Sequence, residues 1–267
     1  MKSRHAFTLI DLLVVIAIVG ILAGLVWPVL ARSRDRARIA TDLNNHKQIL
    51  LAAHMYCGDN GDYLPRPGWR LPYSCWAYGY PFPWGGAATA AAYESIYPQQ
   101  LQSLANGQLY PYLIAPKTLM CPGDRVDSVF YQREMYISSY VWNGAISSFD
   151  SSSARTHRVG EFKPSNILQW ESDETAPGTF NDAADLPSEG FTRRHGGARM
   201  GDPTRDSRSR VTIGLFDGSA RQMPGMTLYQ LSGGLGYGPF GPPPGITSLP
   251  NELWCNPDST NGTKTPF

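Results

Sequence analysis

The sequence lacks the short motifs that mark common enzyme chemistry. It contains no Gly-x-Ser-x-Gly elbow, no glycine-rich phosphate loop and no His-Glu-x-x-His helix, which are signatures of hydrolases, nucleotide-binding proteins and metalloproteases. A triad of His195, Asp217 and one of many serines can be drawn, but such triples arise by chance in chains of this length. We therefore expect no enzymatic activity and interpret His195 as a hydrogen-bonded structural residue.

The sequence also lacks an excess of charge of either sign. Its 23 lysine and arginine residues face 22 acidic residues, which leaves a formal charge of +1. This field is too weak to attract a polyanion, so nucleic acid is not an expected partner. Glycine and proline are abundant, with 27 and 22 residues, and this composition favours turns and short strands over a helical bundle.

Cysteine is scarce and scattered. Cys57, Cys75, Cys121 and Cys255 form no Cys-x-x-Cys pair, so a zinc ribbon is not expected. Their even number is compatible with two disulfides in an exported domain, and buried free thiols are the alternative. His54 and Cys57 lie on one helical face, but two ligands are too few to predict a metal site.

One long stretch is free of charge. Residues 12–31 are twenty residues without a charged side chain, and a helix of this length spans about 30 Å of hydrocarbon. A cleaved secretory signal is the alternative, since residues 29–31 resemble a cleavage site. The run is longer than the usual signal core and Asp11 lies at its leading edge, so we expect a retained membrane anchor.

The residues before this run carry a resemblance to a known family. After a short basic leader, Ala6-Phe7-Thr8-Leu9-Ile10-Asp11-Leu12-Leu13 resembles the prepilin processing motif of type IV pilins and type II secretion pseudopilins. The resemblance implies that a prepilin peptidase removes residues 1–6 and that the new N-terminus, Phe7, is methylated. The family usually has Gly where this chain has Ala6, and Glu where it has Asp11.

The same resemblance implies roles within the helix. A carboxylate in a spanning helix costs about 2.5–3.5 kcal/mol at the bilayer centre and less near its edge. In the family this acid pairs with the terminal amine of a neighbouring subunit, which implies that Asp11 acts in assembly. Gly20 and Pro28 occupy positions where the family tends to have Gly and Pro, and Gly20 with Gly24 forms a helix-contact pattern. We expect Pro28 to kink or locally melt the helix.

The charges around the span give a conflicting orientation. Lys2 and Arg4 precede it, whereas four arginines at positions 32, 34, 36 and 38 follow it. The positive-inside rule alone would leave the large domain in the cytoplasm. The family resemblance implies the opposite orientation, a single-pass protein of the inner (cytoplasmic) membrane with an extracytoplasmic C-terminal domain, and we adopt it.

The helix is expected to continue beyond the membrane. The apolar residues Ile39, Leu43, Leu50, Ala53 and Cys57 fall on one helical face. Gly58 and the Asn60-Gly61 pair then supply stop signals. We therefore predict a helix over residues 7–57, with its membrane span at about 9–31.

Residues 58–224 are expected to form the extracytoplasmic globular domain. Strand signals occur at residues 139–142, 167–170 and 211–215, and Asp217-Gly218 suits a tight turn into a strand at 220–223. Residues 62–98 are rich in Pro, Gly, Trp and Tyr without periodicity, which predicts a long surface excursion stabilised by aromatic packing. An aromatic sugar-binding platform is the alternative use of this segment.

Further motifs are similar to a large group of bacterial proteins with prepilin-type N-termini. They are Leu43-Asn44-Asn45 through Lys47-Gln48-Ile49, Met120-Cys121-Pro122-Gly123-Asp124, Arg194-His195-Gly196-Gly197 and Phe216-Asp217-Gly218. That group often has a His about nine residues before an Asp-Gly pair, whereas 21 residues separate His195 from Asp217 here, through an insertion at 199–210. A site that needs these two residues close together is therefore not expected. We predict that residues 225–267 form a Pro/Gly-rich extension in which only Cys255 suggests attachment to the domain.

Acidic residues gather between positions 171 and 189. The six are Glu171, Asp173, Glu174, Asp182, Asp185 and Glu189. They could supply oxygen ligands to calcium if the loop folds back, although solvated acidic side chains are the simpler interpretation. We otherwise expect no cofactor.

These observations together predict an α+β, pilin-like fold in which a long N-terminal helix packs on a small antiparallel sheet with long loops. The resemblance implies a structural subunit of a type II secretion or type IV pilus-like filament. Its partners would be the membrane, prepilin peptidase and other copies or related pilin-like subunits. The alternative is a solitary membrane-tethered protein that binds glycans or another ligand through residues 69–97.

Overall fold

The computed structural model describes residues 9–70, 72–147, 156–195, 209–233, 249–260 and 262, except for the side chains of Asp11 and Ala31. The processing site at Ala6 and Phe7 lies outside the described residues. The chain divides into two compact units, Met1–Ala40 and Thr41–Phe267, and each is described by itself.

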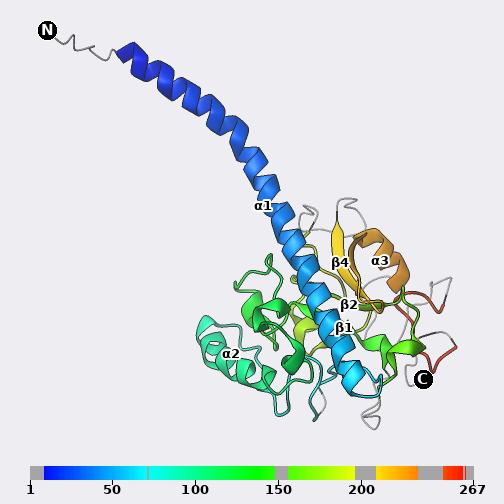
Figure 1. Ribbon diagram of the computed structural model, residues 1–267. Helices are drawn as coiled ribbons and strands as arrows, with labels where there is room; N and C mark the ends of the chain where they lie inside the picture. Colours follow the sequence, from blue (N-terminus) through cyan, green and yellow to red (C-terminus); the bar gives the residue numbers. More distant parts are fainter. Residues whose placement is uncertain are drawn as a thin grey trace. The chain divides into compact units, whose positions relative to one another are not determined.

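A single helix, α1 (Leu9–Asp59), supplies the described part of the first unit and then enters the second (Figure 1). It continues through Pro28, so the local melting predicted there is not seen. Residues Leu12–Asp59 include a window with mean hydropathy 2.8, none of it buried, which is long and apolar enough to cross a membrane. The end at Asp59 lies two residues beyond the predicted one.

The second unit is built on a five-stranded sheet. The strands are β1 (Tyr140–Asn143), β2 (Ile167–Glu171), β3 (Ala184–Asp185), β4 (Arg210–Leu215) and β5 (Ala220–Pro224), in the order β3-β1-β2-β4-β5. The strands predicted from the sequence are confirmed as β1, β2, β4 and β5, and these pair antiparallel. The short β3 pairs parallel with β1, so the sheet is mixed, not purely antiparallel. Two residues are too few to show an alternating pattern in the sequence.

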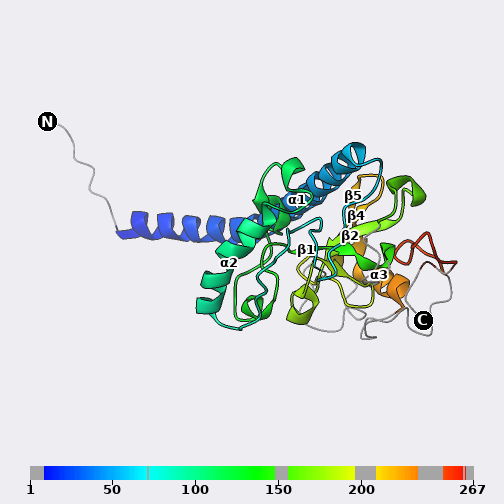
Figure 2. The same cartoon turned by 90° about the horizontal axis from the view of Figure 1, so that it is seen from below.

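Both faces of this sheet are covered. On one face, Trp142, Gln169 and Gly214 come from neighbouring positions on β1, β2 and β4 and lie toward the second half of α1, since a Cβ on Gly214 would meet Leu50. The opposite face carries alternate residues that pack with the short helix α3 (Gly225–Ser232) and with the chain near its C-terminus (Figures 1 and 2). They include Val141, Ile167, Trp170, Val211, Ile213 and Leu215, packed with Leu228, Leu253 and Trp254.

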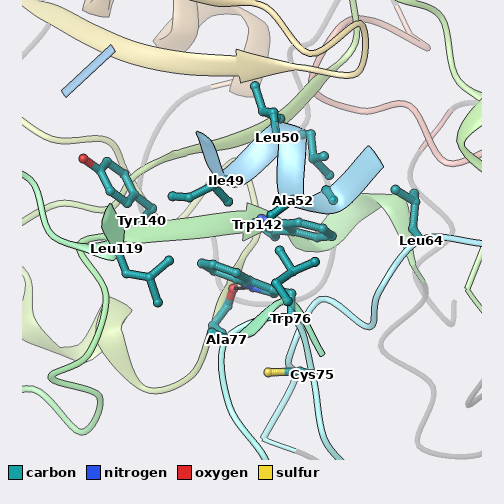
Figure 3. Packing of buried hydrophobic residues seen from close by; sticks show 14 of the residues in the cluster. Ile49, Leu50, Ala52, Leu64, Cys75, Trp76, Ala77, Leu119, Tyr140 and Trp142 are labelled. Atoms are coloured by element: carbon teal, nitrogen blue, oxygen red, sulfur yellow. Dashed lines mark hydrogen bonds between the residues drawn. The ribbon is translucent and has the colours of Figure 1, made fainter. Parts of the chain in front are cut away.

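The core on the α1 side is rich in aromatic residues. The rings of Trp76 and Trp142 stack with centroids 5.3 Å apart and planes 9° apart, and Ile49, Leu50 and Ala52 of α1 lie close by (Figure 3). Trp76 and Tyr78 are fully buried. The segment 62–98 is therefore part of the core, and the predicted surface excursion is wrong for its central residues.

The same segment leads into a helix that was not predicted, α2 (Ala90–Leu104). Thr89 caps it, because its side-chain oxygen accepts a hydrogen bond from the Ala92 amide at 3.2 Å. Its buried residues are Gln100, Ser103 and Leu104. Two of these three are polar, so the helix shows little apolar periodicity in the sequence.

Part of the predicted C-terminal extension is ordered into the domain. Leu253 and Trp254 are fully buried, and the side-chain amide of Asn143 donates to the Leu253 carbonyl at 2.7 Å. Residues 225–232 are helical as α3. The prediction that only Cys255 holds this region is therefore wrong.

Short 3-10 turns complete the fold: η1 (Tyr110–Tyr112), η2 (Pro116–Leu119), η3 (Phe130–Gln132), η4 (Gly144–Ile146), η5 (Val159–Glu161) and η6 (Pro177–Phe180).

Candidate functional site

The second half of α1 presents polar side chains to the core. Leu50, Ala53 and Cys57 are buried as the helical stripe predicted. The first part of that stripe is different: Ile39 and Leu43 are only half-buried. The fully buried positions there are Asp42 and His46, with Asn45 almost as deep. A buried polar surface on a helix needs partners from the rest of the domain.

Asp42 lies in a cluster with three other side chains from separate segments. Glu171 ends β2, Cys121 follows η2, and His195 precedes β4. The Nε2 atom of His195 lies 2.7 Å from Oε2 of Glu171 and 3.4 Å from Oδ2 of Asp42. The same nitrogen is 3.7 Å from the sulfur of Cys121. Each of these four residues is at most 4% exposed, so the cluster is closed to solvent.

The charges in the cluster depend strongly on one another. Burial alone would lower the pKa of His195, but the carboxylates of Glu171 and Asp42 outweigh burial and raise it to about 12. Burial alone would raise the pKa of Asp42, but its interactions with His195 lower it. Burial, with the charge of Glu171, raises the pKa of the Cys121 thiol to about 12. The protein alone thus holds an imidazolium between two carboxylates, beside a neutral thiol.

A second ion network adjoins the cluster. Asp124 accepts two hydrogen bonds from the Arg133 guanidinium, at 2.7 and 2.9 Å, and lies 3.2 Å from the guanidinium of Arg194. Arg194 also donates to Oε1 of Glu171 at 3.1 Å. Burial alone would raise the pKa of Asp124, but the two arginines lower it. Arg194 therefore joins this network to the His195 cluster.

His46 packs beside the cluster in a neutral form. Its Nδ1 accepts a hydrogen bond from the Gln169 side-chain amide at 2.8 Å, and its ring lies edge-on to Tyr140 at 4.5 Å. Burial lowers the pKa of His46. Tyr140 in turn donates to Oδ1 of Asp42 at 2.7 Å, which fixes the carboxylate of Asp42.

These contacts bring together motifs that are far apart in the sequence. Asn45, from the 43–49 motif, donates to the Met120 carbonyl at 3.0 Å, and Arg194 reaches Asp124 across the network. Asp217 instead lies in the β4–β5 turn and accepts from the Ser219 amide at 2.8 Å. His195 thus uses Asp42 and Glu171 as its acidic partners. Asp42 was missed from the sequence, although it lies one turn before His46 on the same stripe.

The six acidic residues between 171 and 189 have separate partners. Asp173 pairs with Arg193, Glu174 accepts from Thr192, Asp182 from the Ala184 amide, Asp185 from Ser172 and Glu189 from the Leu186 amide. Within the described residues, the group close enough to share a metal ion includes Glu171 but none of the other five. The calcium loop considered as the alternative is therefore not formed by these residues. The simpler interpretation, solvated side chains, is wrong for the four that are buried: Glu171, Asp173, Asp182 and Asp185.

The four cysteines, all within the described residues, are free thiols. The predicted pairing into two disulfides is thus not present. Cys121 has its sulfur beside His195, and the sulfur of Cys75 lies against Gly68. Burial raises the pKa of Cys75 and Cys255 to about 12 and that of Cys57 to about 11, so these thiols are neutral and unreactive.

Comparisons with known proteins cover only part of the chain. Residues 1–27 match the family model for the prokaryotic N-terminal methylation motif. Type II secretion system core protein G of Pseudomonas aeruginosa is 39% identical over 62 residues, which cover 23% of this chain and 44% of that protein. The chain thus spans less than half of the length of this relative. No solved structure matches the chain.

A methylation motif followed by a long apolar helix, with a small α+β domain behind it, defines a pilin-like protein. The chain is similar to pilins and pseudopilins in its methylation motif, at residues 1–27, and over the 62 residues that it shares with a type II secretion protein.

Proposed function

We propose that this chain is a structural subunit of a type II secretion or type IV pilus-like filament. The observation that carries the proposal is the apolar surface of the first half of α1, directly behind the methylation motif. Its large hydrophobic side chains from Leu9 to Leu30 are between 45% and 83% exposed. An all-round apolar helix needs a bilayer or other helices around it.

The proposal includes processing before assembly. A prepilin peptidase would cut between Ala6 and Phe7 and the new N-terminal Phe7 would be methylated, as the family resemblance implies. Support comes from the motif match, which spans this bond. N-terminal mass analysis of the native protein should find a methylated Phe7, and an intact Met1 would contradict processing.

The filament would then form from helices held in the inner membrane, with the second unit outside the cytoplasm. The partners are other copies of this chain or related pilin-like subunits. Gly20 and Gly24 support close helix packing, because a Cβ at either position meets no atom within 4 Å and both remain open to a neighbour. Pro28 belongs to the same proposed contact surface.

Asp11 provides the decisive test. A carboxylate next to a twenty-residue apolar run is costly unless an opposite charge offsets it. We propose that this charge is the terminal amine of a neighbouring subunit. Asp11→Ala should therefore leave a stable, membrane-inserted monomer that fails to polymerise, and Asp11→Glu should preserve or improve polymerisation.

The experiment crosslinks each variant in membranes and images sheared filaments. Asp35→Ala is the matched control, because Asp35 lies on the same helix beyond the apolar run and its side chain is 72% exposed. Filaments from Asp11→Ala equal to those of the parent would contradict the proposal. A glycan-binding protein gains no support from the aromatic segment, since Trp76 and Tyr78 are fully buried.

A further inference from the structure

The His195 cluster places three acceptors around one ring nitrogen. Oε2 of Glu171, Oδ2 of Asp42 and the sulfur of Cys121 all face Nε2 of His195, at 2.7, 3.4 and 3.7 Å. A single N–H can donate to one of them at a time. Three acceptors that converge on one proton are the arrangement expected around a bound cation.

Two of these acceptor atoms are unsatisfied within the part of the chain that the structure describes. Oδ2 of Asp42 and Oε2 of Glu171 accept no hydrogen bond of good geometry, although both residues are fully buried. The other oxygen of each carboxylate is held, Oδ1 of Asp42 by Tyr140 and Oε1 of Glu171 by Arg194. Both carboxylates are thus fixed, and in each the oxygen that accepts no hydrogen bond of good geometry is aimed into the cluster.

We propose that Asp42, Cys121, Glu171 and His195 bind one Zn²⁺ ion. Their four ligand atoms, one sulfur, one nitrogen and two oxygens, lie within 4.8 Å of one another. Thiolate and imidazole ligands favour zinc over magnesium or calcium, which prefer oxygen alone. Four protein ligands in a buried site leave no open position, so the ion is structural rather than catalytic.

The three distances that join His195 to the other ligands need little adjustment. In a tetrahedral zinc site, ligand atoms lie about 3.3–3.7 Å apart, given zinc bond lengths of about 2.0–2.3 Å. The contacts of His195 with Asp42 and Cys121, at 3.4 and 3.7 Å, already fall in this range. The contact with Glu171 is 2.7 Å, so this carboxylate must move back by roughly half an ångström.

Zinc also conserves the charge of the buried network. Asp42, Glu171 and Asp124 are balanced by Arg133, Arg194 and the His195 imidazolium. When Zn²⁺ binds, the imidazolium loses its Nε2 proton, the Cys121 thiol loses its S–H proton, and both protons pass to solvent. Two positive charges enter and two leave, so no net charge is added to the core.

The ion would fasten four parts of the domain at one point. Asp42 brings α1, Glu171 the end of β2, and Cys121 the loop after η2. His195 brings a segment that pairs with the start of β4 at Arg210. Because α1 continues into the apolar first unit, the site would anchor the long helix in the globular domain.

The test measures zinc in the untagged full-length protein, purified in detergent from zinc-replete cells. We expect about one zinc per chain, and a large fall in the thermal midpoint when a chelator removes it. Cobalt added to the chelated protein should give a thiolate-to-cobalt charge-transfer band and the visible bands of a tetrahedral site. A parent protein that holds no zinc and shows no such bands would overturn the proposal, whatever the variants do.

Matched variants assign the ligands. Cys121→Ser should abolish the charge-transfer band, and His195→Gln should reduce bound zinc at least tenfold. Cys75→Ser and His54→Gln change the same residue types, in the core and on α1, outside the cluster, and should keep both signals. Retention of the band in Cys121→Ser would show that the metal is bound elsewhere. Equal loss in the Cys75→Ser control would reject this site too.

Discussion

The two halves of α1 differ in what they expose and what they bury. From Leu9 to Leu30 the helix exposes large hydrophobic residues on every side, whereas from Thr41 onward it buries Asp42 and His46. Among the described residues of its own unit, nothing covers the apolar surface of the first half. The second half finds partners for its polar groups in its own domain. One continuous helix therefore has side chains suited to two different environments. The all-round apolar surface of the first half shows that this half needs partners from outside its own unit.

This comparison predicts that damage to the buried half should act on folding and damage to the exposed half should act on assembly. The largest folding effect is expected from Asp124→Ala, in the domain that surrounds the buried half of α1. This change leaves the guanidiniums of Arg133 and Arg194, which are at most 5% exposed, without their shared carboxylate. Removing one partner of a buried ion pair costs about 3–5 kcal/mol. Urea denaturation measures the loss, and Glu94→Ala, at an exposed position, should change stability by less than about 0.5 kcal/mol.

A pair of identical substitutions on the same helix tests the comparison directly. Leu50 is fully buried, whereas Leu22 is 56% exposed. Leu50→Ala should lower the free energy of unfolding of the globular unit by about 2–5 kcal/mol, because it removes methyl groups and leaves a cavity. Leu22→Ala should leave that free energy unchanged and instead weaken filament assembly. If the two variants destabilised the globular unit equally, the division of α1 would be wrong.

Substitution of two glycines tests the same difference between the buried and the exposed half of α1, with a smaller expected loss of stability. A Cβ on Gly214 would lie 2.7 Å from Cγ of Gln169 and 2.9 Å from Cδ1 of Leu50. Both neighbours are fully buried, so Gly214→Ala should cost about 1–3 kcal/mol through overpacking. A Cβ on Gly20 meets no atom within 4 Å. Gly20→Ala should therefore leave thermal unfolding unchanged, and an altered crosslinking pattern in membranes would report its effect on helix packing.

The parts of the fold that the sequence predicted are those with a local signal. The apolar run, the strands around Val141, Leu168 and Ile213, and the Asp217-Gly218 turn all follow from periodicity or turn chemistry. The short β3 and the polar buried face of α2 carry no such pattern. They exist because of partners distant in the chain, as when Trp142 donates its amide to the Ala183 carbonyl.

The candidate site shows the same limit. Cys121 and His195 lie in motifs that could be recognised in the sequence, and Glu171 lies in a stretch rich in acidic residues. Nothing in their spacing says that these residues converge, because each comes from a different segment of the fold. Asp42 could have been suspected as a carboxylate on a buried helical stripe. The partners of Asp42 could not have been predicted in this way, because the sheet register that pairs Tyr140 with Glu171 determines which residues lie beside it.

The last expected effect depends on pH and concerns a buried acid that has no cationic partner among the described residues. Asp185 is fully buried at the end of β3, accepts a hydrogen bond from the Ser172 hydroxyl at 2.5 Å, and lies near Glu189. Burial, reinforced by the charge of Glu189, raises the pKa of Asp185 well above its usual range. This is the opposite of Asp124, whose two arginines lower its pKa.

The raised pKa of Asp185 fixes the sign of a pH effect on stability. The unfolded chain loses this proton near pH 3.9, whereas the folded domain still holds it. Above about pH 4 the folded state therefore binds more protons, and stability falls as the pH rises, by at most about 1.4 kcal/mol per pH unit. Asp185→Asn removes this contribution, so the stability of the variant relative to the parent should rise with pH from about 4 toward the folded-state pKa. Urea denaturation at several pH values measures that difference.

Asp217→Asn is the control of opposite sign, because hydrogen bonds from Ser219 lower the pKa of Asp217. A difference between Asp185→Asn and parent that stays constant with pH would show that Asp185 is already ionised in the folded domain.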